Sequence, residues 1–358
     1  MAAFINGLGN ISAQKTWDNA QFLDEIVEYK DNYLKSVDPD YKEYINPVAI
    51  RRMSHVIKMG IASAKICLQD AGLEMPDAII TGTGFGCIED TEKFLLQVID
   101  NAEEQLTPTA FMQSTHNAVN GQLAIILGCK NYNFTYCQRG FSFENALLDA
   151  FLQCKEKQHT QTLVGGFDEI SPNYYKVNDR IGMWKKEKIS NLALLKHHTP
   201  GTIAGEFSAY FVIGNEATAN NYCELKALES YYKPVNPEFL VEKVKDFSLE
   251  QGCEQPDLVI YGYSGDITED YWMDALKDGL FNNVPGAYYK HLCGEHYTAS
   301  AWATWLGAKV IKENRIPEIC LLPGSAKPMA INKVLILNNY RCRNFSAILL
   351  ERLLMKGI

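Results

Sequence analysis

Cys137 is the residue of this sequence with the clearest potential for chemistry. It follows an extended segment, residues 132–136, and precedes an apolar stretch, residues 141–153, that is typical of a helix. A thiol at the start of a helix faces unpaired backbone N–H groups and the positive end of the helix dipole, and both favour the reactive thiolate. Gly140 lets the turn pack tightly. The pattern predicts a nucleophile, with a buried core cysteine as the alternative.

Cysteine spacing, net charge and the N-terminal sequence restrict the possible classes of function. The ten cysteines contain no CxxC pair and lie in apolar segments, which indicates reduced, buried thiols rather than disulfides or a zinc site. A formal net charge of -9 over 358 residues argues against a general binder of nucleic acid or anionic membranes. The opening MAAFINGLGN has no basic region followed by a long apolar run. We therefore expect a cytoplasmic protein without signal peptide or membrane span.

Short apolar runs bounded by glycine predict buried strands, and stretches with helical spacing lie between them. The predicted strands are residues 78–81, 162–164, 208–213, 258–261 and 346–350. The predicted helices are residues 55–70, which stop at Gly72, and 141–153. This alternation predicts an α/β fold with helices covering the sheets. The lysine-rich residues 185–198 have no clear period and are predicted to be a surface excursion.

A repeat divides the chain in two. Residues 76–82 (PDAIITG) recur as residues 256–262 (PDLVIYG), and at the same offset of 180 the pair Glu89-Asp90 matches Glu269-Asp270. His116 also matches His296 at this offset. Three matches in register predict an internal duplication. We expect an N-terminal half, residues 1–205, that carries Cys137, and a C-terminal half, residues 206–358.

The motifs, in their order and spacing over nearly the whole chain, resemble the ketosynthases, the condensing enzymes of fatty-acid and polyketide synthesis. They are residues 5–12 (INGLGNIS), 52–54 (RMS), 69–73 (QDAGL), 82–86 (GTGFG), 135–140 (TYCQRG), 165–169 (GGFDE) and 205–209 (GEFSA). The resemblance implies the duplicated, five-layered α-β-α-β-α arrangement of thiolases. It also implies that Cys137 accepts an acyl group from a carrier-protein thioester, with its own N–H in an oxyanion hole. No metal or nucleotide cofactor is implied.

The chain departs from this family at both catalytic histidines. Decarboxylating ketosynthases use two histidines to stabilise the enolate formed when a malonyl thioester loses carbon dioxide. The first position falls on Gly262, which has no side chain to donate a hydrogen bond. The second falls on Glu295, whose carboxylate would repel a developing enolate unless protonated. His296 comes one residue later, which on a helix turns its side chain by about 100°.

Two neighbouring features complete the predicted site. Lys290 stands where the family has a lysine, so we expect it to hold Glu295, with a surface lysine as the alternative. The family's glycine-rich C-terminal loop aligns with residues 339–342 (NYRC), which implies a different loop path. Tyr340 is the candidate gate, or else a packed core tyrosine.

Three functions are compatible with these residues. The first is a chain-length-factor-like subunit that pairs with an active ketosynthase. The second is a divergent condensing enzyme or acyltransferase that uses Cys137 with His296, His116 or Glu295, and the third is a structural homodimer. Whether the chain is an enzyme by itself stays open. The first two imply an acidic acyl carrier protein as partner, for which Arg51, Arg52 and Lys58, or residues 185–196, are candidate basic patches.

Overall fold

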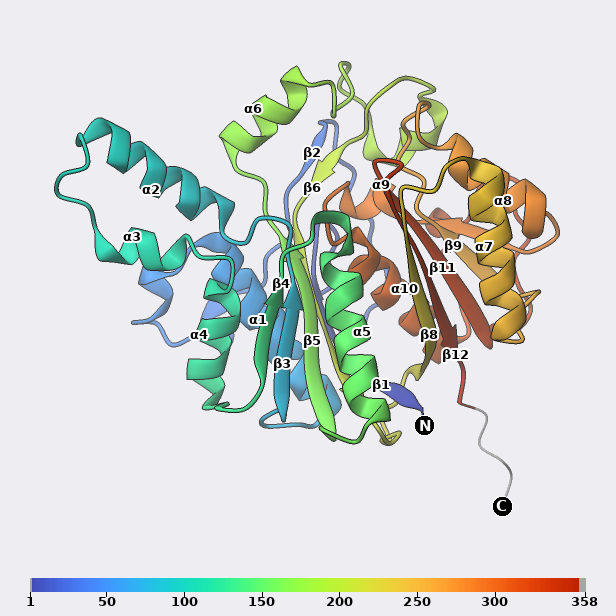
Figure 1. The fold of residues 1–358 in the computed structure, drawn as a ribbon, viewed down its shortest axis with the longest axis horizontal. Coiled ribbons are helices and arrows are strands. Elements are labelled where there is room, and N and C mark those ends of the chain that lie inside the picture. Colours follow the sequence, from blue (N-terminus) through green and yellow to red (C-terminus); the bar gives the residue numbers. More distant parts are fainter. Residues whose placement is uncertain (1, 354–358) are drawn as a thin grey trace.

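Five strands from each half of the chain form one ten-stranded sheet in the computed structural model, which describes residues 2–353 (Figure 1). The strands of the first half are β1 (Ala3–Ile11), β3 (Ala78–Gly82), β4 (Asn133–Tyr136), β5 (Gln161–Asp168) and β7 (Phe207–Gly214). Those of the second half are β8 (Cys223–Tyr232), β9 (Leu258–Tyr261), β10 (Gly286–Tyr288), β11 (Lys333–Tyr340) and β12 (Asn344–Glu351). Outside this sheet, β2 (Tyr33–Leu34) pairs with β6 (Ala204–Gly205).

The two sets of five strands have the same topology. From the edge inward the order is β4-β3-β5-β7-β1 in the first half and β10-β9-β11-β12-β8 in the second. In each half the three outer strands are parallel to one another: β4, β3 and β5 in the first half, and β10, β9 and β11 in the second. The two inner strands, β7 and β1 in the first half and β12 and β8 in the second, are antiparallel to their neighbours. A short antiparallel pairing of β1 with β8 joins the halves. The predicted internal duplication is confirmed.

Helices fill the connections between the strands. In the first half these are α1 (His55–Ala71), α2 (Ile88–Asp100), α3 (Pro108–Gln113), α4 (Ala118–Leu127), α5 (Ser142–Lys155) and α6 (Pro172–Arg180). In the second half they are α7 (Pro237–Glu250), α8 (Tyr271–Leu280), α9 (Lys290–Cys293) and α10 (Ala299–Glu313). The α2 and α3 pair projects from the body at the left of Figure 1. Among the residues that the structure describes, no helix is long and apolar enough to cross a membrane.

Alternating side chains of the strands produce the layers. Ile79 packs with the outer helices α1 and α4, whereas its neighbour Ile80 faces the central helices α5 and α10. In the second half, Val259 faces the outer helices α7 and α8, and Ile260 faces the same central pair. Both strands are buried at every position because helices cover both of their faces. The result is the predicted α-β-α-β-α layering, which is confirmed.

An aspartate performs the same task in each half. Asp77, just before β3, accepts hydrogen bonds from the amides of Thr160 and Gln161 at the start of β5, at 2.9 and 3.0 Å. Asp257, just before β9, accepts from the amides of Asn332 and Lys333 at the start of β11, at 2.7 and 2.9 Å. The recurring Pro-Asp pair of the sequence therefore fixes equivalent strand pairs.

The topology corrects one of the three sequence matches. His116 precedes α4, which lies between the second and third strands of its half, whereas His296 precedes α10, between the third and fourth. The true counterpart of α10 is α5, so the turn that contains Cys137 corresponds to the turn that contains His296. The strand order also assigns β7 to the first half. We therefore propose a boundary between residues 214 and 223, later than the 205/206 boundary expected from the sequence.

Candidate functional site

Two equivalent turns form the site, one from each half. The first joins β4 to α5 and carries Cys137, and the second joins β10 to α10 and carries Lys290, Glu295 and His296. Asp168, at the end of β5, lies near both turns: its charge acts on the Cys137 thiol, and its Oδ2 is 3.9 Å from His296 Nδ1. The structure therefore gathers the predicted site residues around one buried carboxylate.

Cys137 is exposed, and its thiol is not activated by α5. The helix begins only at Ser142, whose hydroxyl accepts a hydrogen bond from the Gln138 amide at 2.8 Å. Partial burial, and then the Asp168 charge, raise the pKa of the Cys137 thiol to about 11. Our expectation of a favoured thiolate was wrong, because a 3-10 turn, residues 139–141, separates the cysteine from the helix.

Lys290 and Glu295 form a fully buried ion pair. Lys290 Nζ lies 2.7 Å from Glu295 Oε2 and also donates to the Asn339 carbonyl oxygen at 2.5 Å. Their side chains are 0% and 1% exposed, which excludes the alternative of a surface lysine. Burial raises the pKa of the Glu295 carboxyl, and the Lys290 charge offsets part of that increase. The lysine therefore neutralises the carboxylate that replaces the expected histidine.

His296 enters the same cavity as Glu295. The expected rotation by a helical step does not apply, since residues 294–298 are not helical and α10 begins at Ala299. The His296 ring stacks on Phe207 with centroids 4.1 Å apart, and neither ring nitrogen has a hydrogen-bond partner among the described residues. Burial, and then the nearby Lys290 charge, lower the pKa of His296 well below its usual value. The imidazole is neutral at physiological pH.

Asp168 is held by four donors. Its Oδ1 accepts from the Gly84 amide at 2.7 Å and from the Thr83 hydroxyl at 3.2 Å. Its Oδ2 accepts from the Thr298 amide and hydroxyl at 2.9 and 2.7 Å. Burial nevertheless raises the pKa of Asp168 to about 6. The sequence motif placed this residue at a strand end but did not assign it to the site. The acidic pair Asp168-Glu169 at the end of a buried strand is the signal that could have identified it.

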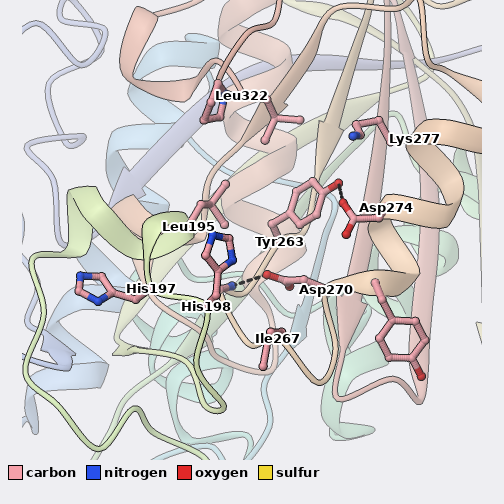
Figure 2. A pocket seen from close by; sticks show the side chains of 12 residues that line it. Leu195, His197, His198, Tyr263, Ile267, Asp270, Asp274, Lys277 and Leu322 are labelled. Atoms are coloured by element: carbon pink, nitrogen blue, oxygen red, sulfur yellow. Dashed lines mark hydrogen bonds between the residues drawn. The ribbon is translucent and has the colours of Figure 1, made fainter.

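Gly262 follows β9 and lies close against the neighbouring strand β11. A Cβ at this position would lie 3.0 Å from the Asn338 Cα and 3.0 Å from the Asn339 amide nitrogen. The following turn is fixed by Asp270, which accepts from the Ser264 and Gly265 amides, both at 2.8 Å. Figure 2 shows the Asp270 carboxylate beside that turn, in a separate cavity of about 340 Å³ that His197 and His198 also line. A histidine at 262 would require the strand beside it to move.

Tyr340 lies at the end of β11 in an aromatic cluster above the site. Its ring packs against Tyr297 with centroids 4.7 Å apart, and it is 7% exposed. A Cβ at Gly140 would lie 2.8 Å from the Tyr340 Cβ, so the Cys137 turn and this tyrosine are in close contact. Sequence reasoning named Tyr340 but missed Phe85, Tyr174 and Tyr297, which come together only in the fold.

Two further predicted residues do not join the site. His116 is exposed, with its backbone against Gly86. Lys185 is only 2% exposed and donates to the carbonyl oxygens of His197, Thr199 and Gly265, at 3.1, 3.0 and 2.8 Å. It therefore anchors the 185–198 segment and cannot contribute to a basic surface patch. Among the described residues, no cluster of three or more His, Cys, Asp or Glu side chains is arranged to hold a metal.

Known proteins share this architecture. Residues 28–195 match the family model described as beta-ketoacyl synthase, N-terminal domain. An ishigamide ketosynthase/chain length factor superposes with a TM-score of 0.81 at 16% identity, over 98% of this chain and 99% of that one. The chain is ketosynthase-like. Its fold resembles that of ketosynthases and chain length factors, and no curated protein matches its sequence.

Two other solved structures similar to this ketosynthase-like chain are complexes. A ketosynthase with its chain length factor from Xenorhabdus doucetiae gives a TM-score of 0.76 at 14% identity, over 98% of each chain. A type II polyketide acyl-carrier protein in complex with its ketosynthase gives 0.73 at 14% identity, over 98% of this chain and 99% of that one. At these identities the likeness establishes the fold.

Proposed function

We propose that this chain is a chain-length-factor-like subunit of cytoplasmic type II fatty-acid or polyketide biosynthesis, which pairs with an active ketosynthase. The observation that carries the proposal is the buried Lys290–Glu295 ion pair at the position where the family has a histidine. A nascent enolate needs hydrogen-bond donors, and the Lys290 ammonium already donates to Glu295 and Asn339. Gly262 offers no side-chain donor, and its backbone amide already donates to the Leu337 carbonyl oxygen at 2.7 Å.

The outer edge of the first half supports pairing with a second chain. Strand β4 ends the sheet, so the backbone groups of its outer edge have no strand partner. Apolar side chains on and beside this strand and on α5 are exposed, between 37% and 47%: Tyr132, Phe134, Leu148 and Leu152. An apolar surface around an open strand edge fits a second sheet. We infer that a ketosynthase covers this edge, and a homodimer is the alternative outcome.

A carrier protein would find positive charge near α1. Arg51 and Arg52 are exposed at the entry to that helix, and Lys58 is partly exposed one turn into it. Arg52 also lines a groove of about 480 Å³ between α1, α3 and α4, together with Met112 and Ile125. A basic rim beside an apolar groove suits an acidic carrier domain. With Lys185 buried, we favour this surface over the 185–196 segment.

The decisive experiment measures carbon dioxide release from malonyl carrier protein. We expect none above background from the isolated chain, and release when the chain is co-purified with its ketosynthase. Replacement of the partner's two catalytic histidines should abolish carbon dioxide release by the pair, while Cys137→Ala in this chain should leave it unchanged. Chain extension by the isolated protein would overturn the proposal.

A second function, acyl transfer by Cys137, is favoured by the exposure of its thiol. In this reaction the cysteine sulfur attacks a carrier-protein thioester, and the carrier thiol leaves with a proton. Mass spectrometry of Cys137 after incubation with acyl carrier protein, with and without the partner, tests it. A covalent acyl group on Cys137 would support transfer, whereas an unmodified thiol in both samples would exclude it.

A further inference from the structure

Two cavities meet at the site and share a wall. The outer cavity, of about 440 Å³, opens between the Cys137 turn and the β11–β12 turn, and its lining includes Arg139, Arg341 and Arg343. The inner cavity, of about 10 Å³, is lined by Asp168, Glu295 and His296, among others. Met183 and Tyr297 belong to both linings. These two side chains therefore separate a wide cationic entrance from the buried polar residues.

Tyr297 is held in this wall by contacts on every side. Its ring covers Gly84, where an added Cβ would lie 2.1 Å from the tyrosine Cδ2. Phe85 meets it edge-on with centroids 5.2 Å apart, and Tyr340 packs on it at 4.7 Å. The Tyr174 hydroxyl donates to the Tyr297 hydroxyl at 3.3 Å. A glycine at 84 is what permits the ring to lie there.

The inner cavity contains polar atoms that nothing in the described structure satisfies. Both His296 ring nitrogens and Glu295 Oε1 lack hydrogen-bond partners among residues 2–353. Buried polar atoms are normally paired, so unpaired ones that face a cavity indicate a place built for a ligand or water. A volume of about 10 Å³ holds at most one water molecule and no acyl chain.

We propose that Tyr297 is the residue that excludes acyl thioesters from this chain's own buried cavity, by closing it at the inner end of the arginine-lined entrance. This specificity role rests on the proposed function, since it explains why a ketosynthase-like cavity would not compete with the partner for substrate. Replacing the ring by a methyl group joins the two cavities into one. The hydroxyl is secondary, because the ring itself fills the space.

Carbethoxylation by diethyl pyrocarbonate tests the closure in the purified protein. The reagent attaches to neutral imidazole, and His296 is neutral, so its rate of modification reports access to the cavity. We expect peptide mass spectrometry to find His296 unmodified in the wild type while the exposed His198 reacts. In Tyr297→Ala, His296 should react roughly tenfold faster or more, because access no longer needs a local opening. Tyr297→Phe should stay protected.

Tyr271→Ala is the matched control, because this tyrosine is 49% exposed and lines the separate cavity of about 340 Å³. It should leave His296 protected. Circular dichroism verifies that each variant is folded, and an unchanged rate at His198 does so for the two Tyr297 variants. Fast modification of His296 in the wild type, or continued protection in folded Tyr297→Ala, would overturn the proposal. Neither outcome depends on pairing with a ketosynthase, so failure here is distinguishable from failure of the proposed function.

Discussion

At the scale of single residues, the surroundings decide which groups of the site can react. Cys137 has the accessibility of a nucleophile but, with a pKa of about 11, not the ionisation of one. Lys290 and Glu295 neutralise each other, and His296 is kept neutral by burial. A site whose lysine and glutamate balance each other and whose histidine is enclosed is consistent with the proposed role of a subunit that does not condense by itself.

Lys290→Met should be strongly destabilising. The change leaves Glu295 buried without a counter-charge, so we expect a loss of roughly 3–5 kcal/mol in the free energy of unfolding at pH 7. A buried carboxyl without a partner has a raised pKa, and its stability contribution is retained below about pH 4.5 and lost as the pH rises. Urea unfolding from pH 4.5 to 8 should therefore show the smallest loss at the acidic end.

Lys188→Met provides the matched control for that change. Lys188 pairs with Asp31 at 2.8 Å, but the two side chains are 71% and 53% exposed. An exposed pair contributes about 0–1 kcal/mol. Equal losses for the two variants would contradict a structural role of the buried pair.

Alkylation of Cys137 by iodoacetamide should be slow at neutral pH. With a pKa of about 11, the thiolate fraction at pH 7 is roughly 10⁻⁴. We expect a rate roughly 10–100-fold below that of a free cysteine peptide, since the higher nucleophilicity of a basic thiolate offsets part of the difference. The rate should rise about tenfold per pH unit from 7 to 9. A plateau below pH 8, absent in Cys137→Ser, would reveal an activated thiol instead.

At the scale of elements, the two halves supply the turns of the site from equivalent places, between the third strand and the central helix, α5 or α10. These turns carry different residues, Cys137 in one and Glu295-His296 in the other. Strand β4 positions the first turn and also forms the open edge of the sheet. A partner that covers this edge would therefore contact the segment that leads into the cysteine.

Phe134→Asp should prevent pairing of this chain with its partner. Phe134 is 46% exposed on β4, and a buried unpaired carboxylate in an apolar interface is costly. We expect the wild type to co-purify with its ketosynthase and the variant to elute alone in size-exclusion chromatography. Val235→Asp, at a position 81% exposed between β8 and α7, should pair normally. If Phe134→Asp still pairs with the ketosynthase, the partner binds another surface of this chain.

At the scale of the whole molecule, duplication makes one core out of two similar halves. Helices α5 and α10 lie between the inner faces of both sets of strands and share a single hydrophobic cluster. Apolar strand faces outside this centre are covered by separate helix pairs. Neither half covers the central helices by itself, so the halves are expected to fold as one cooperative unit.

Asp77→Ala and Asp257→Ala should have similar effects, because both aspartates hold the start of a neighbouring strand. Each change leaves two strand amides without their acceptor, and we expect losses of roughly 1–3 kcal/mol in the free energy of unfolding. The double variant should be additive within about 0.5 kcal/mol, since the two sites share no partner. Asp278→Ala, on an exposed side chain, controls for loss of charge. Strongly unequal losses for the two single variants would show that the two aspartates do not have equivalent structural roles.

The sequence by itself determined much of the framework. Apolar runs bounded by glycine predicted β3, β5, β7, β9 and β12, and helical spacing predicted α1 and α5. These patterns are local, so they survive without tertiary information. Strands β8 and β11 were missed, although β11 has four consecutive apolar residues before Asn338 and β8 alternates between buried and more exposed residues at its start. The motifs around Cys137, Lys290 and Gly262 contributed to the predicted fold, which is confirmed.

The tertiary structure alone decided what the site can do. Lys185 lies in a lysine-rich segment that the sequence predicts to be exposed. In the structure it is buried, and it donates to the backbone carbonyl oxygens of residues 197, 199 and 265. Tyr297 closes the cavity over Gly84, 213 positions earlier in the chain. The match of His116 with His296 was a coincidence of spacing that only strand order could expose. Periodicity reports which face of an element is buried, whereas burial depth, pKa and cavity shape depend on contacts between distant segments.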